Sequence, residues 1–281
     1  MRDIDCKDIA EAVAKLAVEA CCILPEDVVE SFRAHQAAEP SPVGRNILQQ
    51  LLDNAGIAQA TKTPLCQDTG LAVIFADVGQ EVHIVGGAFE DAVNEGVRKG
   101  YVEGYLRKSS VAEPLFERKN TGDNTPAVLH VRIVPGDRLV LRLAPKGAGS
   151  ENKSVVKMLV PADGIEGVKK VVLDAVKAAG PNSCPPMVVG VGIGGNFEKS
   201  AELAKHALTR PLNKKAQNES VDALEAELLH MINNTGIGPA GLGGRVTALA
   251  VNIETYPTHI AQLPVAVNIC CHVNRHSTIT L

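Results

Sequence analysis

The chain has 281 residues, of which 45% are hydrophobic and 21% charged, and its formal net charge is -4. These values are ordinary for a globular protein with a sizeable buried core. The mild negative charge, the 3% aromatic content and the lack of tryptophan argue against a nucleic-acid-binding surface. No stretch reaches the roughly 18 apolar residues of a membrane span, and Met1–Asp5 is unlike a signal peptide, so we expect no membrane association and a cytoplasmic protein.

The first 62 residues are predicted to be helical. Apolar residues recur at helical spacing at Ile4, Ile9, Val13, Leu16 and Ala20. A second helix is expected to begin after Pro25, because acidic residues follow this proline in the first turn. A third is expected to begin at Ser41-Pro42.

From residue 63 onwards, short apolar runs alternate with amphipathic stretches. Strands are predicted at 71–78, 127–134, 138–144, 155–160, 187–193, 246–253 and 265–269, and helices at 89–106, 165–179, 196–208 and 220–233. The turn sequence 135–137 predicts that the strands on either side of it pair with each other. We therefore predict an α/β fold in one cluster-binding domain, 1–281, with a helical N-terminal region (1–62) before a mixed α/β region (63–281) whose Gly/Pro-rich loops carry the functional residues.

The seven cysteines are an odd number in a long chain without a secretion signal, which argues against a disulfide framework. We expect core positions for Cys6, Cys21 and Cys22, which lie in or beside the first helix. Three others lie in loops next to predicted strands, where functional residues concentrate: Cys66, Cys184 and Cys271. They are either unrelated thiols or the ligands of one site, since no Cys-x-x-Cys pair marks a zinc ribbon or a ferredoxin.

If these three thiols converge on an iron–sulfur cluster, the chemistry is constrained. A cubane cluster normally takes four thiolates, so three leave one iron with an open position. Such an iron is a Lewis acid for a hydroxyl and a carboxylate group. Ligation by three cysteines therefore favours hydration or dehydration over electron transfer.

Several longer motifs then indicate a family. In chain order they are Cys66–Gly70, Lys119–Ala127, Lys146–Lys153, Asn182–Pro186 and Cys271–His276. Together they resemble the class I, iron–sulfur fumarate hydratases and the related L-tartrate dehydratases, from about residue 5 to the C-terminus. The resemblance implies a hydro-lyase that reversibly hydrates fumarate to L-malate. Conversion of tartrate to oxaloacetate stays open as the nearest alternative.

The resemblance also implies a set of cluster ligands. Cys66, Cys184 and Cys271 would hold a [4Fe-4S] cluster. Because side chains alternate along a strand, Cys270 and Cys271 would not both face it, and the Cys-x-x-x-Arg part of the motif favours Cys271 with Arg275. A zinc-binding structural subunit is the alternative from another class.

For the reaction itself, the resemblance implies that Asp68 delivers a proton to the departing hydroxyl group. Substrate contacts would come from Gln67, Arg107, Gly149 and His259. A guanidinium suits a carboxylate, and glycine permits close backbone approach. Three of these residues also have an ordinary interpretation: Asp68 as a turn former before Thr-Gly, Arg107 as a solvated arginine at a helix end, and His259 as a hydrogen-bonded surface or core histidine.

The chain resembles only the N-terminal region of longer family members and stops soon after the third cysteine motif. The resemblance therefore implies a separate β subunit that supplies the catalytic base, in an α2β2 assembly that acts on a small dicarboxylate. We expect this chain to hold the cluster but to need that partner for turnover.

Two glycine-rich stretches are expected to be structural. Gly190-x-Gly192-x-x-Gly195 matches the dinucleotide-binding fingerprint, but no second strand is predicted within the required βαβ unit. We expect these glycines to let a turn pack beside Cys184. The stretch 236–244 lacks the Gly-Lys-Ser/Thr ending of a phosphate loop and is expected to be a close-packed or flexible loop near the cluster.

Overall fold

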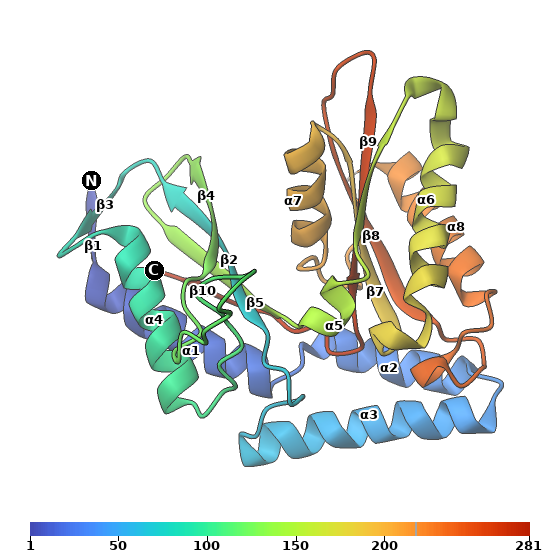
Figure 1. Cartoon of the computed structure of the whole chain (residues 1–281), viewed down its shortest axis with the longest axis horizontal. Helices are drawn as coiled ribbons and strands as arrows, with labels where there is room; N and C mark the ends of the chain where they lie inside the picture. The colour runs from blue at the N-terminus through green and yellow to red at the C-terminus, as the bar shows by residue number, and fades with distance from the viewer. Residues whose placement is uncertain (217) are drawn as a thin grey trace. The chain divides into compact units, whose positions relative to one another are not determined.

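A computed structural model describes residues 1–216 and 218–281 of the chain (Figure 1). The chain divides into two compact units. Unit 1 comprises Met1–Pro25, Ala55–Ala148 and Arg275–Leu281, and unit 2 comprises Glu26–Asn54 and Gly149–Asn274. Within the described residues, no helix is long and apolar enough to cross a membrane. The predicted α/β class, with helices at the N-terminal end, is confirmed.

Unit 1 contains a four-stranded sheet. The strands lie in the order β10 (Ser277–Thr280), β5 (Leu139–Lys146), β2 (Leu71–Gly79) and β4 (Val128–Val134). Helices α1 (Cys6–Cys22) and α4 (Phe89–Glu103) share a hydrophobic core with one face of this sheet. A second, parallel pair joins β1 (Arg2–Asp5) to β3 (Val82–Val85).

Two expectations for unit 1 were wrong. The strands on either side of the 135–137 turn do not pair, because β2 lies between them, parallel to β4 and antiparallel to β5. The turn instead encloses the end of β2, where the amide of Glu81 donates to the carbonyl of Gly136. Ile4 belongs to β1 rather than to a helix, and Asp5 then caps α1 by accepting the N–H of Lys7 at 2.8 Å.

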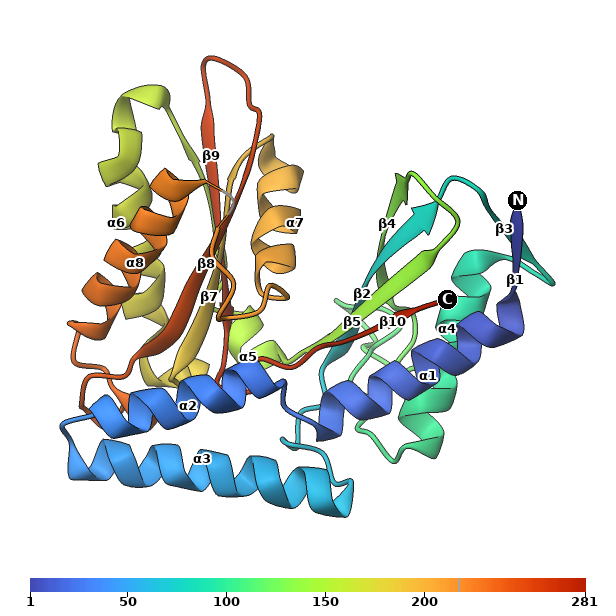
Figure 2. The ribbon, with the colours of Figure 1, turned by 180° about the vertical axis from the view of Figure 1, so that it is seen from behind.

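Unit 2 is a three-layer α/β arrangement. Its sheet has the order β6 (Val155–Leu159), β9 (Leu263–Cys270), β7 (Met187–Gly194) and β8 (Ala248–Tyr256). As seen from behind in Figure 2, α7 (Phe197–Ala207) covers one face, and α6 (Gly164–Ala179) and α8 (Glu219–Asn233) cover the other. Unit 2 also holds α2 (Glu26–Ala38) and the first part of α3 (Pro42–Thr61), and the short α5 (Ala148–Glu151) lies at its boundary.

Two of the three glycines of the apparent dinucleotide fingerprint, Gly190 and Gly192, belong to strand β7 itself, and Gly195 directly follows it. A Cβ atom at Gly190 would lie 2.1 Å from the carbonyl oxygen of Ala204, and one at Gly192 would lie 2.0 Å from that of Ser200. The glycines therefore let α7 pack directly on the strand, and do not act beside Cys184 as expected. The parallel neighbour β8 follows only after both α7 and α8, so the local βαβ unit of that fingerprint is not formed.

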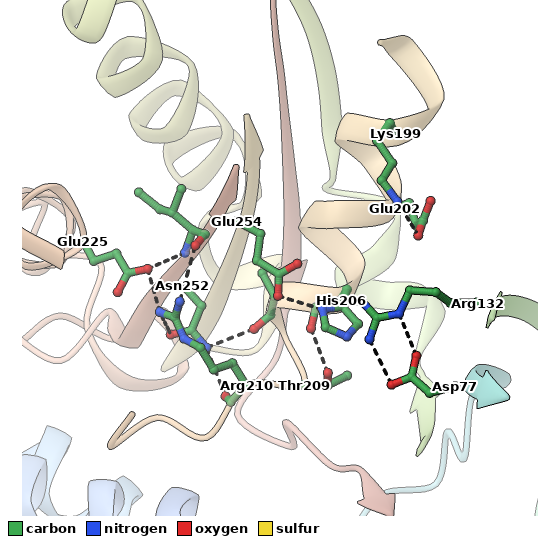
Figure 3. Close-up of polar contacts among 12 residues, drawn as sticks. Asp77, Arg132, Lys199, Glu202, His206, Thr209, Arg210, Glu225, Asn252 and Glu254 are labelled. Atoms are coloured by element: carbon green, nitrogen blue, oxygen red, sulfur yellow. Dashed lines mark hydrogen bonds and ion pairs between the residues drawn. The ribbon is translucent and has the colours of Figure 1, made fainter. Parts of the chain in front are cut away.

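A buried polar network ties the helices of unit 2 to its sheet (Figure 3). Arg210 donates to Glu225 of α8 at 2.6 Å and to Asn252 of β8 at 3.1 Å. The same Glu225 oxygen accepts the amide of Ile253 at 2.6 Å. Breaking a buried ion pair by removing one partner typically costs about 3–5 kcal/mol, so this network fixes α8 against β8.

Candidate functional site

In unit 1, the loop between α3 and β2 brings a thiol and a carboxylate into one tight turn. The Asp68 carboxylate accepts the amide of Gly70 at 2.9 Å and the amide of Ala148 at 3.0 Å. The sulfur of Cys66 accepts the amide of Asp68 at 3.4 Å, and its thiol donates to the exposed Gln67. Asp68 thus forms a local turn through its hydrogen bond with Gly70. Its second carboxylate oxygen binds the amide of Ala148, which is distant in the sequence.

Buried side chains stabilise the Asp68 loop by donating hydrogen bonds to its backbone carbonyls. The hydroxyl of Tyr101 donates to the carbonyls of Thr69 and Gly70 at 3.0 and 3.2 Å. Arg275, only 5% exposed, donates to the carbonyl of Asp68 and to that of Pro145. The sequence reasoning assigned no role to Arg275, although the Cys-x-x-x-Arg spacing was the signal that pointed to it. It acts by fixing the backbone that carries Asp68.

The thiol of Cys21 also contacts the backbone of the Asp68 loop. Its sulfur donates to the carbonyl of Thr69 at 3.7 Å, and the residue is fully buried. Burial raises the pKa of Cys21 to about 12, although the nearby charge of Arg275 opposes the shift. Burial likewise raises the pKa of Tyr101 well above its usual value. Both groups are therefore neutral at physiological pH, which confirms the core position expected for Cys21.

Arg107 lies beyond the end of α4, which stops at Glu103 rather than at residue 106. The hydroxyl of Thr69 accepts the amide of Arg107 at 2.9 Å and donates to its carbonyl at 3.1 Å, so the backbone of Arg107 is tied to the Asp68 loop. Its side chain is exposed and forms no ion pair or hydrogen bond with any described residue. Because its backbone is fixed and its guanidinium group is exposed, Arg107 can donate hydrogen bonds to a carboxylate.

The motif Lys119–Ala127 contributes a connector to this arrangement. Asn124 is completely buried, and its amide nitrogen donates to the carbonyl of Gly70 at 3.1 Å. Its amide oxygen accepts the amide of Ser109 at 2.6 Å. Asn124 therefore joins the segment just after Arg107 to the start of β2.

In unit 2, two of the proposed ligand cysteines lie at one edge of the sheet. Cys184 is three residues before β7, and Cys271 directly follows β9. Because these strands are antiparallel, with Val188 opposite Cys270, both loops emerge together. The backbone amide and the Nδ1 atom of His272 lie 3.2 and 3.0 Å from the carbonyl oxygen of Cys184.

Cys184 has a strained backbone. Its φ of 52° and ψ of 64° place it in the left-handed region, and its side chain is exposed. For a residue with a Cβ this costs about 1–2 kcal/mol. Such strain persists where the surroundings over-determine it, and it is concentrated at functional sites.

Cys270 and Cys271 differ in burial. Cys270 is the last residue of β9, is buried, and its sulfur lies 3.9 Å from the carbonyl of Val273. Cys271 is half-buried, and a hydrogen bond with Cys270, together with burial, raises the pKa of its thiol well above the usual range. A metal that binds Cys271 must therefore release its proton. The deeper burial of Cys270 favours Cys271 as the available thiol.

His259 lies at the opposite edge of the unit 2 sheet from these cysteines. It is in the exposed connection between β8 and β9, next to the end of β7, where Thr258 donates to the carbonyl of Gly195. An eight-residue strand such as β7 spans about 26 Å, so the fold does not bring His259 to Cys184 or Cys271. Gly149 follows Ala148 directly in the sequence. A Cβ atom added at Gly149 would meet no other atom within 4 Å, so there is open space beside its backbone.

The available donors fit an iron–sulfur cluster in their chemistry. None of the seven cysteines forms a disulfide bond, and the three on loops are at least partly exposed. Unit 1 contributes Cys66, and unit 2 brings Cys184 and Cys271 together. Over residues 1–216 and 218–281, no group of three His, Cys, Asp or Glu side chains is arranged to hold a metal ion.

These features define an α/β chain whose loops present thiols, a carboxylate and an exposed arginine, which are the groups that a metal-assisted lyase needs. The chain belongs to the fumarate hydratase (fumerase) family of hydro-lyases, whose model matches residues 10–280.

Curated relatives cover nearly the whole chain. A protein of Methanocaldococcus jannaschii named "Putative L(+)-tartrate dehydratase subunit alpha" is 41% identical over 275 residues, which are 96% of each chain. The proteins named L(+)-tartrate dehydratase subunit alpha in Escherichia coli K12 and Shigella sonnei are each 32% identical over 275 residues, 96% of this chain and 90% of theirs.

Proposed function

We propose that this chain is the α subunit of an iron–sulfur hydro-lyase that reversibly adds water to fumarate to give L-malate. The observation that carries this proposal is the Asp68 loop. It holds a carboxylate two residues from the Cys66 thiol and is tied to the backbone of an exposed arginine, Arg107. Loss of a hydroxyl group from malate requires a proton donor and a cation for the carboxylate, and the Asp68 loop and the arginine tied to it provide them.

Cys66, Cys184 and Cys271 are the proposed ligands of a [4Fe-4S] cluster. Three thiolates leave one iron with an open position, and when bound the cluster would supply a Lewis acid for the substrate hydroxyl and one carboxylate. The family supports this assignment, as do the exposure of these three loop thiols and their absence from any disulfide bond.

The protein's own residues then divide the work. Asp68 protonates the hydroxyl oxygen as it leaves. The two backbone amides orient its carboxyl group for this role. The Arg107 guanidinium binds a substrate carboxylate, and Gln67 adds a polar contact. Gly149 offers open backbone beside Ala148.

A β subunit completes the proposed enzyme. The relatives are named as alpha subunits, which supports a partner for this chain. We propose that the partner supplies the base that removes the proton next to the second carboxylate, in an α2β2 assembly. The chain alone is then inactive.

L-tartrate dehydration to oxaloacetate is the second candidate. The printed names of the relatives favour it over fumarate. Tartrate carries one hydroxyl group more than malate, so the same proton donor and the same arginine serve both substrates. The choice depends on contacts around that additional hydroxyl.

The test is an anaerobic assay of chain reconstituted with iron and sulfide, with and without its β subunit. Loss of fumarate absorbance and formation of oxaloacetate from L-tartrate are followed in parallel. Turnover of fumarate only in the mixture supports the first proposal. Turnover of tartrate alone replaces it with the second, and no turnover of either by a mixture with an intact cluster rejects both.

A further inference from the structure

Glu39, which lies between α2 and α3 in unit 2, has a carboxylate that the proposed mechanism does not use. Its side chain is 1% exposed, and no described cation pairs with it. It accepts the amide of Ser41 at 2.9 Å, the amide of Arg245 at 2.9 and 3.1 Å, and the amide of Val246 at 2.7 Å. Burying a carboxylate costs free energy unless it is hydrogen-bonded. These amides therefore stabilise the Glu39 carboxylate, and the carboxylate fixes the position of the backbone that carries them.

Two glycines allow the backbone to approach the Glu39 side chain this closely. A Cβ atom at Gly44 would lie 2.9 Å from the Glu39 side chain, and one at Gly244 would lie 2.7 Å from its carboxylate. Gly244 also has a φ of 111°, which side chains rarely adopt. The glycine-rich stretch 236–244 is thus shaped around Glu39 at its C-terminal end.

The other side of the same stretch rests on the segment that carries Cys184. The amide of Ala240 donates to the carbonyl of Pro185 at 2.8 Å. A Cβ atom at Gly241 would lie 2.3 Å from the ring of Pro181. Contacts therefore run from Glu39 through the 236–247 loop to both sides of Cys184, whose strained backbone needs such support.

We propose that Glu39 is a positioning residue for Cys184: it locks the 236–247 loop, and the loop holds Cys184 in its left-handed conformation. The inference rests on the proposed function in taking Cys184 as a cluster ligand. The mechanical link itself can be measured without a cluster. Glu39 touches neither the thiol nor the substrate, so it is not a catalytic residue.

The test is amide hydrogen exchange, resolved by residue, on the full metal-free chain under reducing anaerobic conditions. Glu39→Gln keeps the size of the side chain but points an amide group at N–H donors. We expect exchange at Arg245, Val246, Ala240 and Cys184 to become about tenfold faster or more, because hydrogen bonds to a charged acceptor are lost. The control is Glu30→Gln, an exposed carboxylate on α2, which should change none of them.

Three results would overturn the proposal. If Arg245 and Val246 exchange in Glu39→Gln at the same rate as in the wild type, Glu39 does not lock the loop. Faster exchange there with wild-type exchange at Cys184 would show that the loop does not hold the cysteine. Equal acceleration throughout, including at Gly70 in unit 1, would show a general loss of stability.

Three further measurements keep the proposal testable. Glu39→Asp retains the charge and should restore part of the protection. If Glu39→Gln does not fold, Gly241→Ala acts on the loop directly and should accelerate exchange at Cys184 through its clash with Pro181. After reconstitution, Glu39→Gln should lose iron to a chelator faster than Glu30→Gln. A wild-type chain that takes up no cluster would reject the proposed function while leaving the exchange result intact.

Discussion

At the scale of the residue, Asp68 combines a structural and a chemical role that one substitution can separate. Asparagine keeps a carbonyl oxygen for one of the two backbone amides that the carboxylate accepts, but it cannot donate an acidic proton. We expect Asp68→Asn to lower kcat by about 10²–10⁴-fold, the usual contribution of a general acid. Iron content should stay at the wild-type level.

The control for this variant is Asp53→Asn, an exposed carboxylate on α3. It should leave both kcat and iron content unchanged. Full activity of Asp68→Asn with an intact cluster would exclude the acid role. Loss of the cluster along with activity would instead identify Asp68 as a residue that shapes the Cys66 loop.

Cys21 makes a testable contribution to the pH dependence of stability. Its folded-state pKa is raised from 9.0 to about 12, so the folded chain keeps a proton that the unfolded chain releases. The contribution is fully present below pH 9 and declines as pH rises from 9 towards 12, by up to about 1.4 kcal/mol per pH unit. Denaturant unfolding of the wild type and Cys21→Ala at pH 8, 9.5 and 10.5 checks this. A slope that persists unchanged in Cys21→Ala would assign it to other groups.

At the scale of the element, the contact of α7 with β7 depends on two strand glycines. In Gly192→Ala the new Cβ would lie 2.0 Å from the carbonyl of Ser200, so α7 must shift away from the sheet. We expect a loss of about 3 kcal/mol in the free energy of unfolding, at the upper end of overpacking effects. The matched control is Gly149→Ala, which meets no atom within 4 Å and should change stability by less than about 0.5 kcal/mol. Similar stabilities for the two variants would contradict this account of the fingerprint glycines.

The elements also mark where sequence reasoning succeeds and where it stops. The starts of α2 and α3 after Pro25 and at Pro42 were predicted correctly, because proline and acidic first turns act locally. The pairing across the 135–137 turn was wrong, because strand order depends on a segment, β2, that lies far away in the sequence. Turn residues indicate that the chain reverses, but not which strand fills the gap.

The same limit applies to the candidate site. The motif Cys66–Gly70 and the exposed Arg107 could be found from the sequence, and the structure ties them together through Thr69. The supports could not be found, because the partners of Arg275 and Glu39 are about two hundred positions away along the chain. A buried carboxylate or guanidinium looks like any surface charge until the fold surrounds it.

At the scale of the whole molecule, cluster binding should appear as stability. A group that binds only the folded chain stabilises it by about 4 kcal/mol at a thousand times its Kd. For a chain of this size we expect anaerobic reconstitution with iron and sulfide to raise the unfolding midpoint by about 5 °C or more. Treatment with a chelator should reverse the gain.

Serine variants then identify the thiols responsible. Cys66→Ser, Cys184→Ser and Cys271→Ser should each lose most of the gain, since each removes a proposed ligand. Cys6→Ser should keep it, because Cys6 is a half-buried thiol at the start of α1, outside the proposed set. Retention of the full gain in any of the first three would remove that cysteine from the ligand set. A gain produced by zinc alone, in protein that contains no sulfide, would replace the cluster with a structural zinc site.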